Sequence, residues 1–275
     1  MNESPAEYGV VGHPVSHSRS PFIHGIFAQR TGQNMVYRPH DVHPDELHTF
    51  VMDFWRRGGK GLNVTVPHKI SASGMVRAMS ERAERAGAVN TLLMDEDGIT
   101  GDNTDGAGLV RDLTGNLNVA LNAARILLVG SGGAARGVIA PLLNESPAII
   151  VIAGRSTARA ESLARQFNAS GPVEGCGLDS FAPRRIRSHH QCHLRGAGRR
   201  GPADTAECGP SAELLLRHVL CPGRNAFLGW ARGMGCTRVA QGWGMLVEQA
   251  AESFELWRGV RPPTEPVLAA LVADG

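Results

Sequence analysis

The sequence lacks the patterns of a membrane protein, a secreted protein and a disulfide scaffold. No apolar run approaches the roughly 20 residues that a membrane-spanning helix needs. Residues 1–8 are short and polar, without the charged and then apolar pattern of a signal peptide. The five cysteines form no CxxC pair and are too sparse for a disulfide framework. We therefore expect a reducing, cytoplasmic location.

The chain also has almost no net charge. Its 28 Lys and Arg residues nearly balance 26 Asp and Glu residues, for a formal net charge of +2. This gives no general reason to expect nucleic acid or an anionic membrane as a partner. A length of 275 residues, 42% of them hydrophobic, suits one large domain or two domains of ordinary size.

Short apolar runs alternate with helical stretches, which predicts an α/β protein with parallel strands. In the first part we expect strands at 8–11, 61–66 and 89–94, a helix at about 21–30, and a loop at 98–108. In the second part we expect strands at 125–129 and 149–153, with helices at 135–143, 158–167 and 244–257.

A glycine-rich turn lies between the strand at 125–129 and the helix that follows it. It fits GxGxxG/A, with Ala135 in the last place, and contains Gly130, Ser131, Gly132, Gly133 and Ala134. Such a turn lets a pyrophosphate approach the free N–H groups of a helix N-terminus. Glycines also serve ordinary turns, but the strand–turn–helix context favours a dinucleotide site.

The end of the next strand distinguishes the two nicotinamide cofactors. An NAD site usually places a carboxylate about 20 residues after the glycine turn. This chain instead has Arg155 and Arg159 there. Because arginine pairs bidentately with phosphate, these residues favour the 2′-phosphate of NADP over two solvated surface arginines.

Three polar clusters follow predicted strands, at residues 17–21, at 63–69, and at 90–91 with 101–106. Each alone is more typical of a capped turn. Together they indicate a pocket for a small polyhydroxylated ligand, because open α/β sheets bind ligands at strand ends. Lys69 beside a carboxylate could support a proton transfer coupled to hydride transfer.

Six motifs occur together in one order: HSRSP, NVTVPHK, GAVNT, GDNTDG, GSGGAAR and GMLVEQAAE. In order and approximate spacing the chain resembles the shikimate dehydrogenases, over residues 1 to about 180 and 226–275. The resemblance implies a two-domain oxidoreductase that reversibly reduces 3-dehydroshikimate to shikimate with NADPH, in aromatic amino-acid biosynthesis. It implies a substrate domain at 1–105 completed by 240–275, and a Rossmann domain for NADP at 106–239.

The resemblance also implies roles for individual residues. Lys69 would be the general acid/base, with Asp105 as its partner. The substrate would be held by Ser18, Ser20, Thr65, Asn90 and Gln249. NADP would be held by Gly130, Ser131, Gly132, Gly133, Ala134, Arg155, Arg159 and Gly242, with Glu81 nearby. The expected partner is the small-molecule substrate, without metal, nucleic acid or membrane, and a homodimer is left open.

Residues 183–224 depart from this pattern. They are rich in Arg, His, Gly and Cys, with only Ile186 and Val219 as β-branched aliphatics and no Phe, Tyr or Trp. The family's Asn-Ala-Thr-Ser and Tyr-Asp-Met-x-Tyr motifs should lie here, and neither is present. Smaller departures are Gly154, where the family often has Asn, and Gln241, where it has Asp.

A shifted reading frame accounts for this segment. Codons for residues 186–197, read one base later, can give Phe-Asp-Leu-Ile-Ile-Asn-Ala-Thr-Ser-Ala-Gly-Leu. The same shift over residues 216–221 can give Tyr-Asp-Met-Ser-Tyr. We infer that residues from about 183 to 223 are translated out of frame, and that the frame is restored before Phe227.

Three alternatives stay open. A paralogue that accepts quinate and NAD is disfavoured by the two arginines after the second strand. An inactive ligand-binding relative is favoured by the disrupted segment and disfavoured by Lys69 and Asp105. A metal- or nucleic-acid-binding module could use residues 184–224, but the spacing of His189, His190, Cys192 and His193 fits no common zinc pattern.

We predict that the chain with the sequence as it stands differs in solubility and activity from a chain in which the reading frame of residues 183–223 is restored. Burying one unpaired guanidinium costs several kcal/mol, against a total stability of about 5–15 kcal/mol. The chain with the sequence as it stands should lose a strand of the cofactor domain, keep residues 183–223 as irregular coil, and be insoluble or inactive. Expressing both chains and following NADPH oxidation with 3-dehydroshikimate tests this, and equal solubility and activity would contradict it.

Overall fold

The computed structural model describes residues 4–178, 191–195, 214–217 and 238–273. The chain separates into two compact units, Met1–Gly108 with Leu246–Ala273 and Leu109–Met245 with Asp274–Gly275. Each unit contains one six-stranded sheet and helices, so the α/β class expected from the sequence is confirmed. None of the described helices is both long and apolar enough to cross a bilayer.

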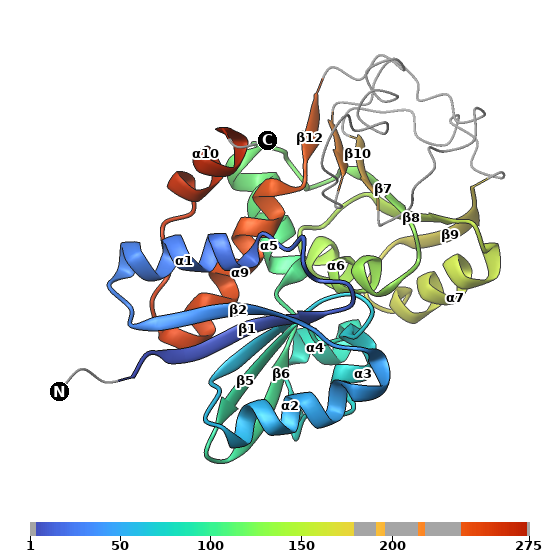
Figure 1. The fold of residues 1–275 in the computed structure, drawn as a ribbon. Coiled ribbons are helices and arrows are strands. Elements are labelled where there is room, and N and C mark those ends of the chain that lie inside the picture. The colour runs from blue at the N-terminus through green and yellow to red at the C-terminus, as the bar shows by residue number, and fades with distance from the viewer. Residues whose placement is uncertain (1–3, 179–190, 196–213, 218–237, 274–275) are drawn as a thin grey trace. The chain divides into compact units, whose positions relative to one another are not determined.

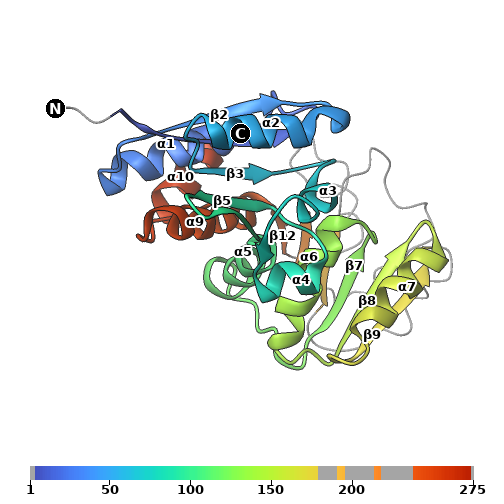
Figure 2. The ribbon, with the colours of Figure 1, turned by 90° about the horizontal axis from the view of Figure 1, so that it is seen from below.

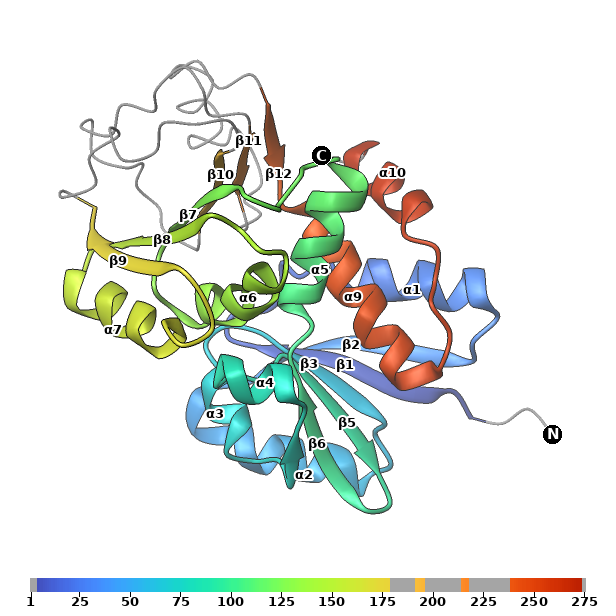
Figure 3. The same cartoon turned by 180° about the vertical axis from the view of Figure 1, so that it is seen from behind.

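The first unit contains a mixed sheet in the order β2-β1-β3-β5-β6-β4. Its strands are β1 (Ala6–Gly12), β2 (Met35–Asp41), β3 (Gly61–Val64), β4 (Ala78–Met79), β5 (Thr91–Asp95) and β6 (Gly98–Asp102). Its helices are α1 (Ser20–Thr31), α2 (Leu47–Arg56), α3 (Lys69–Ser73), α4 (Glu81–Ala86), α10 (Glu265–Ala273), and parts of α5 (Asp105–Arg111) and α9 (Trp243–Arg258); a 3-10 turn spans Pro44–Glu46. Helices α1 and α9 lie on one face of the sheet, and α2, α3 and α4 lie on the other (Figure 1, Figure 3).

Helix α2 shows why one face of this sheet is covered. Its buried residues Leu47, Val51 and Phe54 recur at helical spacing. They join Leu62 of β3 and Leu92 of β5 in one apolar cluster in which all five side chains are at most 1% exposed. The amphipathic pattern of the sequence therefore fixes which side of α2 meets the sheet.

The hairpin of β5 and β6 corrects the expectation of a loop at 98–108 and, for this sheet, the expectation of parallel strands. Strand β6 begins at Gly98 and pairs antiparallel with β5, and β5 also runs antiparallel to β3. The turn between them places Gly98 at φ 130, and the Asp97 N–H donates to the Asp95 carboxylate at 3.0 Å. An Asp-Gly turn before a short apolar run is a hairpin signal in the sequence, and the expectation overlooked it.

The second unit contains an all-parallel sheet in the order β12-β11-β10-β7-β8-β9. Its strands are β7 (Arg125–Val129), β8 (Ile149–Gly154), β9 (Val173–Gly177), β10 (Gln191–Arg195), β11 (Leu214–Arg217) and β12 (Val239–Gln241). Helices α6 (Gly133–Asn144) and α7 (Thr157–Phe167) follow β7 and β8, and a π turn spans Asp112–Asn116. When the strands of this unit are numbered along the chain with β7 as the first, their order in the sheet is that of a Rossmann fold.

Strands β7 and β8 are apolar on both faces, as a parallel sheet requires. Ile126 and Leu128 of β7 join the cluster that contains α6 and α7 residues. Leu127 of β7 belongs to a separate cluster with Val151 and Ala153 of β8. Successive side chains of a strand point to opposite faces, so one apolar run supplies both clusters. Figure 2 shows α7 alongside β8 and β9.

Strands β10 and β11 correct the expectation that residues 183–223 form only irregular coil. Strand β10 pairs in parallel with β7, from Gln191↔Arg125 to Arg195↔Val129, and β11 pairs with β10 and β12. Strand pairing uses backbone N–H and C=O groups, which every residue here has, so a lack of β-branched residues does not prevent it. The expectation was based on the scarcity of β-branched and aromatic residues, and it did not take into account the apolar run of Leu214, Leu215 and Leu216. The rest of the segment lies outside the described residues.

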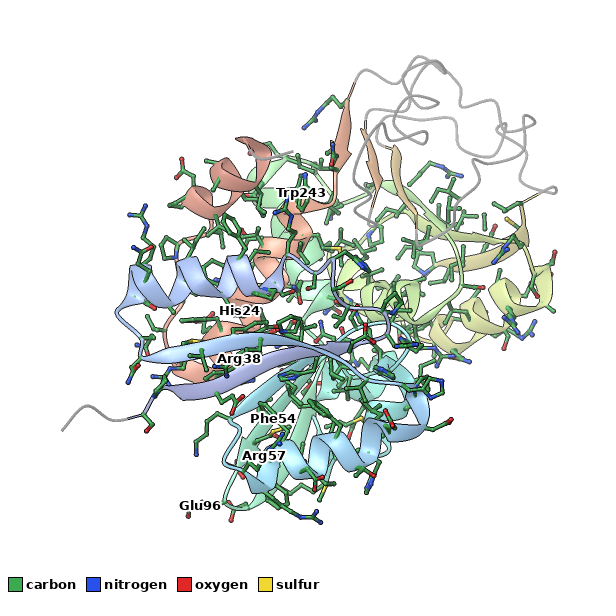
Figure 4. The ribbon with its side chains drawn as sticks, viewed as in Figure 1. His24, Arg38, Phe54, Arg57, Glu96 and Trp243 are labelled. Carbon is green, nitrogen blue, oxygen red and sulfur yellow. The ribbon has the colours of Figure 1, made fainter. Side chains whose placement is uncertain are left out.

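A buried histidine lies in the aromatic core between α1, α9 and the sheet. His24 is fully buried, and its ring stacks on Tyr37 at a centroid distance of 4.1 Å (Figure 4). Phe27, Phe254 and Trp257 surround the same ring. Burial lowers the pKa of His24 to about 3, so the ring is neutral in the folded protein.

We predict that His24 makes the protein acid-sensitive. The folded pKa of about 3 lies below the ordinary histidine pKa of 6.5, so the unfolded chain takes up a proton that the folded chain does not as the pH falls below 6.5. This one site contributes up to about 1.4 kcal/mol of lost stability per pH unit. His24→Phe should flatten the fall in the free energy of unfolding between pH 6.5 and about 5 in urea titrations. His48→Phe, at an exposed histidine of α2, should keep the slope of the parent, and equal slopes for all three proteins would contradict the prediction.

Candidate active site

Lys69 and Asp105 form a largely buried ion pair in the first unit. Lys69 is the first residue of α3, and Asp105 is the first residue of α5. The Lys69 Nζ lies 2.5 Å from Asp105 Oδ2, and the two side chains are 15% and 5% exposed. A cation and a carboxylate with so little water around them interact more strongly than an exposed pair. The two residues that the sequence predicts as acid/base and partner are thus brought together.

Asn90 holds the other oxygen of the same carboxylate. Its Nδ2 donates to Asp105 Oδ1 at 2.8 Å, and its Oδ1 accepts from the Thr104 N–H at 2.8 Å. Asn90 directly precedes β5, and Thr104 lies between β6 and α5. The antiparallel pairing of β5 with β6 therefore sets the distance between Asn90 and Asp105.

A second group of charges fixes the end of β6, three residues before Asp105. Arg82 donates to both oxygens of Asp102, at 2.7 and 2.8 Å, and to Glu252 of α9 at 2.8 Å. Burial alone would raise the pKa of the Asp102 carboxyl, but hydrogen bonds from Arg82 and Ser80 outweigh it and lower that pKa below its usual value. The strand end is therefore held by a bidentate, charge-assisted contact.

The other predicted substrate residues lie in the same unit. The Ser18 Oγ accepts from the Ser20 N–H at 3.3 Å, at the start of α1. The methyl group of Thr65 lies against Gly12 at the end of β1, where a Cβ would approach it to 2.4 Å. The Gln249 Oε1 accepts from the Thr104 hydroxyl at 3.5 Å. Contacts thus join Gln249 to the Asn90–Asp105 group, and they join Ser18 to Ser20.

Two residues of this site were not singled out from the sequence. Ser253 is fully buried, and its Oγ lies 2.8 Å from Thr91 Oγ1 and 3.2 Å from Thr104 Oγ1. It follows Gln249 by four residues in α9, so helical spacing could have placed it on the same face. Tyr37 of β2 donates to Asn63 Oδ1 at 2.8 Å. Its position in an edge strand gave no sequence signal for a polar role.

The glycine turn of the second unit has the geometry of an anion site. Gly130 adopts φ 116, a conformation that favours glycine, and Gly132 is the N-cap of α6. A Cβ at Gly132 or Gly133 would meet no described heavy atom within 4 Å. Among the described residues no side chain caps this helix, so its first N–H groups can bind phosphate.

The remaining predicted cofactor residues are distributed over both units. Arg155 and Arg159 are exposed at the start of α7, and neither guanidinium pairs with another described residue. Gly242 is buried in the turn between β12 and α9. Glu81 belongs to the first unit, where it is exposed and pairs with Arg85 at 2.6 Å.

These residues fit a dinucleotide with a 2′-phosphate. The helix N-terminus is open, and Ser131 and Ala134 belong to the same turn. Two exposed guanidinium groups follow the second strand of the Rossmann sheet, where the ribose phosphate of NADP would lie. The described part of the chain places no carboxylate among residues 154–159 to select NAD.

Comparisons with family models match three stretches of the chain. The shikimate dehydrogenase substrate binding domain matches residues 10–92, and the shikimate / quinate 5-dehydrogenase model matches residues 112–181. The shikimate 5'-dehydrogenase C-terminal domain matches residues 242–272. Residues 182–241 lie between the last two matches and include the segment inferred to be out of frame.

Similar proteins extend the match over nearly the whole chain. The shikimate dehydrogenase (NADP(+)) of Methylococcus capsulatus is 47% identical over 274 residues, covering 98% of this chain and 97% of the relative. The structure of an Ael1 enzyme from Pseudomonas putida is 36% identical with a TM-score of 0.87, covering 97% of this chain and 98% of that one. The structure of shikimate 5-dehydrogenase from Thermus thermophilus in complex with NADP(H) and shikimate is 28% identical with a TM-score of 0.80, covering 96% and 98%.

The buried Lys69–Asp105 pair, the Rossmann sheet with its glycine turn, and these matches agree with one another. Identity of this degree over almost the full length, together with family models across most of the chain, leaves one assignment. The chain belongs to the shikimate dehydrogenase family.

Proposed function

We propose that this protein is an NADP-dependent oxidoreductase that reversibly reduces 3-dehydroshikimate to shikimate, in the pathway to aromatic amino acids. The observation that carries the proposal is the buried ion pair of Lys69 and Asp105, at 2.5 Å, in a chain of the shikimate dehydrogenase family. Reduction of a ketone to an alcohol adds a hydride to carbon and a proton to oxygen. A lysine held by a carboxylate supplies that proton.

Lys69 is the acid in reduction and the base in oxidation. In reduction its ammonium group donates a proton to the carbonyl oxygen as that oxygen becomes negative, and Asp105 keeps the ammonium group at the oxygen. In oxidation the neutral amine takes the hydroxyl proton back. Asn90 keeps the Asp105 carboxylate in place from its other oxygen, at 2.8 Å.

The remaining polar residues of the first unit bind the substrate. We assign its carboxylate and hydroxyl groups to Ser18, Ser20, Thr65, Asn90 and Gln249. Hydroxyl and amide side chains both donate and accept hydrogen bonds, as a ligand with a carboxylate and several hydroxyls needs. The substrate domain in this proposal is accordingly 1–105 with 240–275, most of which belongs to the first unit.

The domain at 106–239, most of which belongs to the second unit, would bind NADP. Gly130, Ser131, Gly132, Gly133 and Ala134 would hold the pyrophosphate, and Arg155 and Arg159 would hold the 2′-phosphate; Gly242 and Glu81 are further candidates. When bound, NADPH supplies the hydride. The role of the chain is to hold the phosphates by backbone N–H groups and guanidinium groups.

Two alternatives within the family are retained. A quinate dehydrogenase that uses NAD is consistent with the name of one matching family model, and the exposed Arg155 and Arg159 argue against it. An inactive relative is consistent with residues 183–223 being out of frame, because one matching family model ends at residue 181 and the next begins at residue 242. The intact pair of Lys69 and Asp105 argues against inactivity by loss of the proton donor.

Lys69→Ala should abolish turnover and leave NADP affinity nearly unchanged. Loss of a general acid/base costs about 10²–10⁴-fold in rate. Lys60, the other lysine of the chain, is exposed and provides the matched control Lys60→Ala. Steady-state NADPH oxidation and cofactor titration measure both effects. More than about half of the parent's activity in Lys69→Ala would remove this lysine from the mechanism.

Arg155→Ala combined with Arg159→Ala should weaken NADP binding much more than NAD binding. Each lost charge-assisted contact to phosphate costs about 1.5–3 kcal/mol, and NAD lacks the 2′-phosphate. Arg165→Ala, at an exposed arginine farther along α7, is the control and should affect neither cofactor. Calorimetric titration with both cofactors is the measurement, and equal losses for NADP and NAD would count against this assignment.

A further inference from the structure

A chain of buried hydrogen bonds in the first unit ends on the Asp105 carboxylate. It involves Tyr37, Asn63, Thr91 and Asn90, of which the last three are at most 6% exposed. We propose that Tyr37 is a positioning residue for the reaction, because its phenol is the donor at the far end of the hydrogen-bond chain that supports the Asp105 carboxylate. This inference rests on the proposed roles of Lys69 and Asp105.

The orientation of the Asn90 amide is fixed at the Asp105 end. One atom of this amide faces the Thr104 backbone N–H at 2.8 Å. A backbone N–H can only donate, so that atom is Oδ1, and the other atom is the donor Nδ2. Nδ2 faces Asp105 Oδ1 at 2.8 Å, and the carboxylate receives a hydrogen bond there. A reversed amide would place two acceptors against each other.

The orientation of the Asn63 amide is fixed in the same way at the other end. One of its atoms lies 3.3 Å from the Asn90 carbonyl oxygen. A backbone carbonyl can only accept, so that atom is Nδ2, and Oδ1 needs a donor. The Tyr37 hydroxyl is that donor, at 2.8 Å. Burial raises the pKa of Tyr37 well above its usual value, so the phenol keeps its proton for this bond.

The middle of the chain connects the two amides through hydroxyl groups. Asn63 Nδ2 donates to Ser253 Oγ at 2.9 Å, and its second proton is shared between the Asn90 carbonyl and Thr91 Oγ1, each at 3.3 Å. Thr91 Oγ1, which also lies 2.8 Å from Ser253 Oγ, donates to Asn90 Oδ1 at 2.8 Å. A hydroxyl has one proton, so accepting from Asn63 leaves Thr91 free to donate toward Asn90.

All donors therefore point from Tyr37 toward Asp105. The phenol donates to Asn63, Asn63 donates to Thr91, and Thr91 donates to Asn90. Asn90 then donates to Asp105, whose second oxygen receives the Lys69 ammonium group. Without the phenol proton, Asn63 Oδ1 loses its 2.8 Å hydrogen bond from Tyr37, although the Asn90 carbonyl still fixes which way the amide faces. The Asn63 side chain is then held less firmly, and so is the support that it gives to Thr91, Asn90 and the Asp105 carboxylate.

Tyr37→Phe removes only the hydroxyl group and tests the proposal. We expect kcat for 3-dehydroshikimate reduction to fall about two- to tenfold, the factor that corresponds to one net hydrogen bond. The KM values for NADPH and for substrate should stay within about twofold of the parent, since an interaction that acts only in the transition state affects kcat and not KM. A purely structural role would lower stability and leave kcat per folded molecule unchanged.

Tyr8→Phe is the matched control. Tyr8 is the other tyrosine of the chain, is buried, and pairs in register with Tyr37 between β1 and β2. Its ring packs on Trp257 at 4.9 Å, in the same aromatic cluster. Its hydroxyl is not a member of the chain to Asp105, so kcat should stay at the parent value in this variant.

A double-mutant cycle separates a common chain from independent effects. Thr91→Val keeps the shape of Thr91 and removes the hydroxyl that donates to Asn90. If both residues act through one chain, Tyr37→Phe with Thr91→Val should reduce kcat no more than the stronger single variant does. The proposal would be overturned if the two single-variant reductions in kcat multiply in the double variant. It would also be overturned if Tyr37→Phe keeps the parent kcat, or if its only effect is a higher KM for the substrate. Failure of the proposed function would instead appear as an active Lys69→Ala variant, so the two failures are distinguishable.

Discussion

The buried ion pair of Lys69 and Asp105 constrains most of the first unit. Two opposite charges with so little water need partners for their remaining donors and acceptors, because an unpaired buried charge costs several kcal/mol. Asn90 satisfies the second carboxylate oxygen, and Thr104 orients Asn90. These residues lie at the ends of β5 and β6, so the hairpin and the ion pair require each other. The Arg82 contacts to Asp102 and Glu252 hold the same strand end to α9.

The two units present different kinds of binding group, and each kind suits a different class of ligand. The first unit presents side-chain hydroxyls, amides and one ion pair, which suit a small ligand with a carboxylate and several hydroxyls. The second unit presents backbone N–H groups at the start of α6 and two exposed guanidinium groups, which suit phosphates. A reaction that combines a proton with a hydride needs both kinds of site, and the structure of the similar Thermus thermophilus enzyme contains both NADP(H) and shikimate.

Residues 191–195 and 214–217, within the segment inferred to be out of frame, pair as strands of the second sheet. Strands β10 and β11 still occupy the middle of the Rossmann order, beside β7 and β12. Ladder hydrogen bonds come from groups that every non-proline residue has, whereas burial of a central strand depends on its side chains.

The sequence by itself determined the α/β class, the glycine turn, the choice of NADP and the pair Lys69 and Asp105. Each of these depends on residue type at short range: apolar periodicity, glycine before a helix, arginine after a strand, and motifs of a few residues. Only the tertiary structure decided that β5 and β6 form an antiparallel hairpin, and that His24 is buried and neutral. It alone joined Tyr37, Asn63 and Ser253, which are far apart in sequence, into one chain of hydrogen bonds. Such contacts depend on which strands and helices pack together, and local spacing contains no record of that packing.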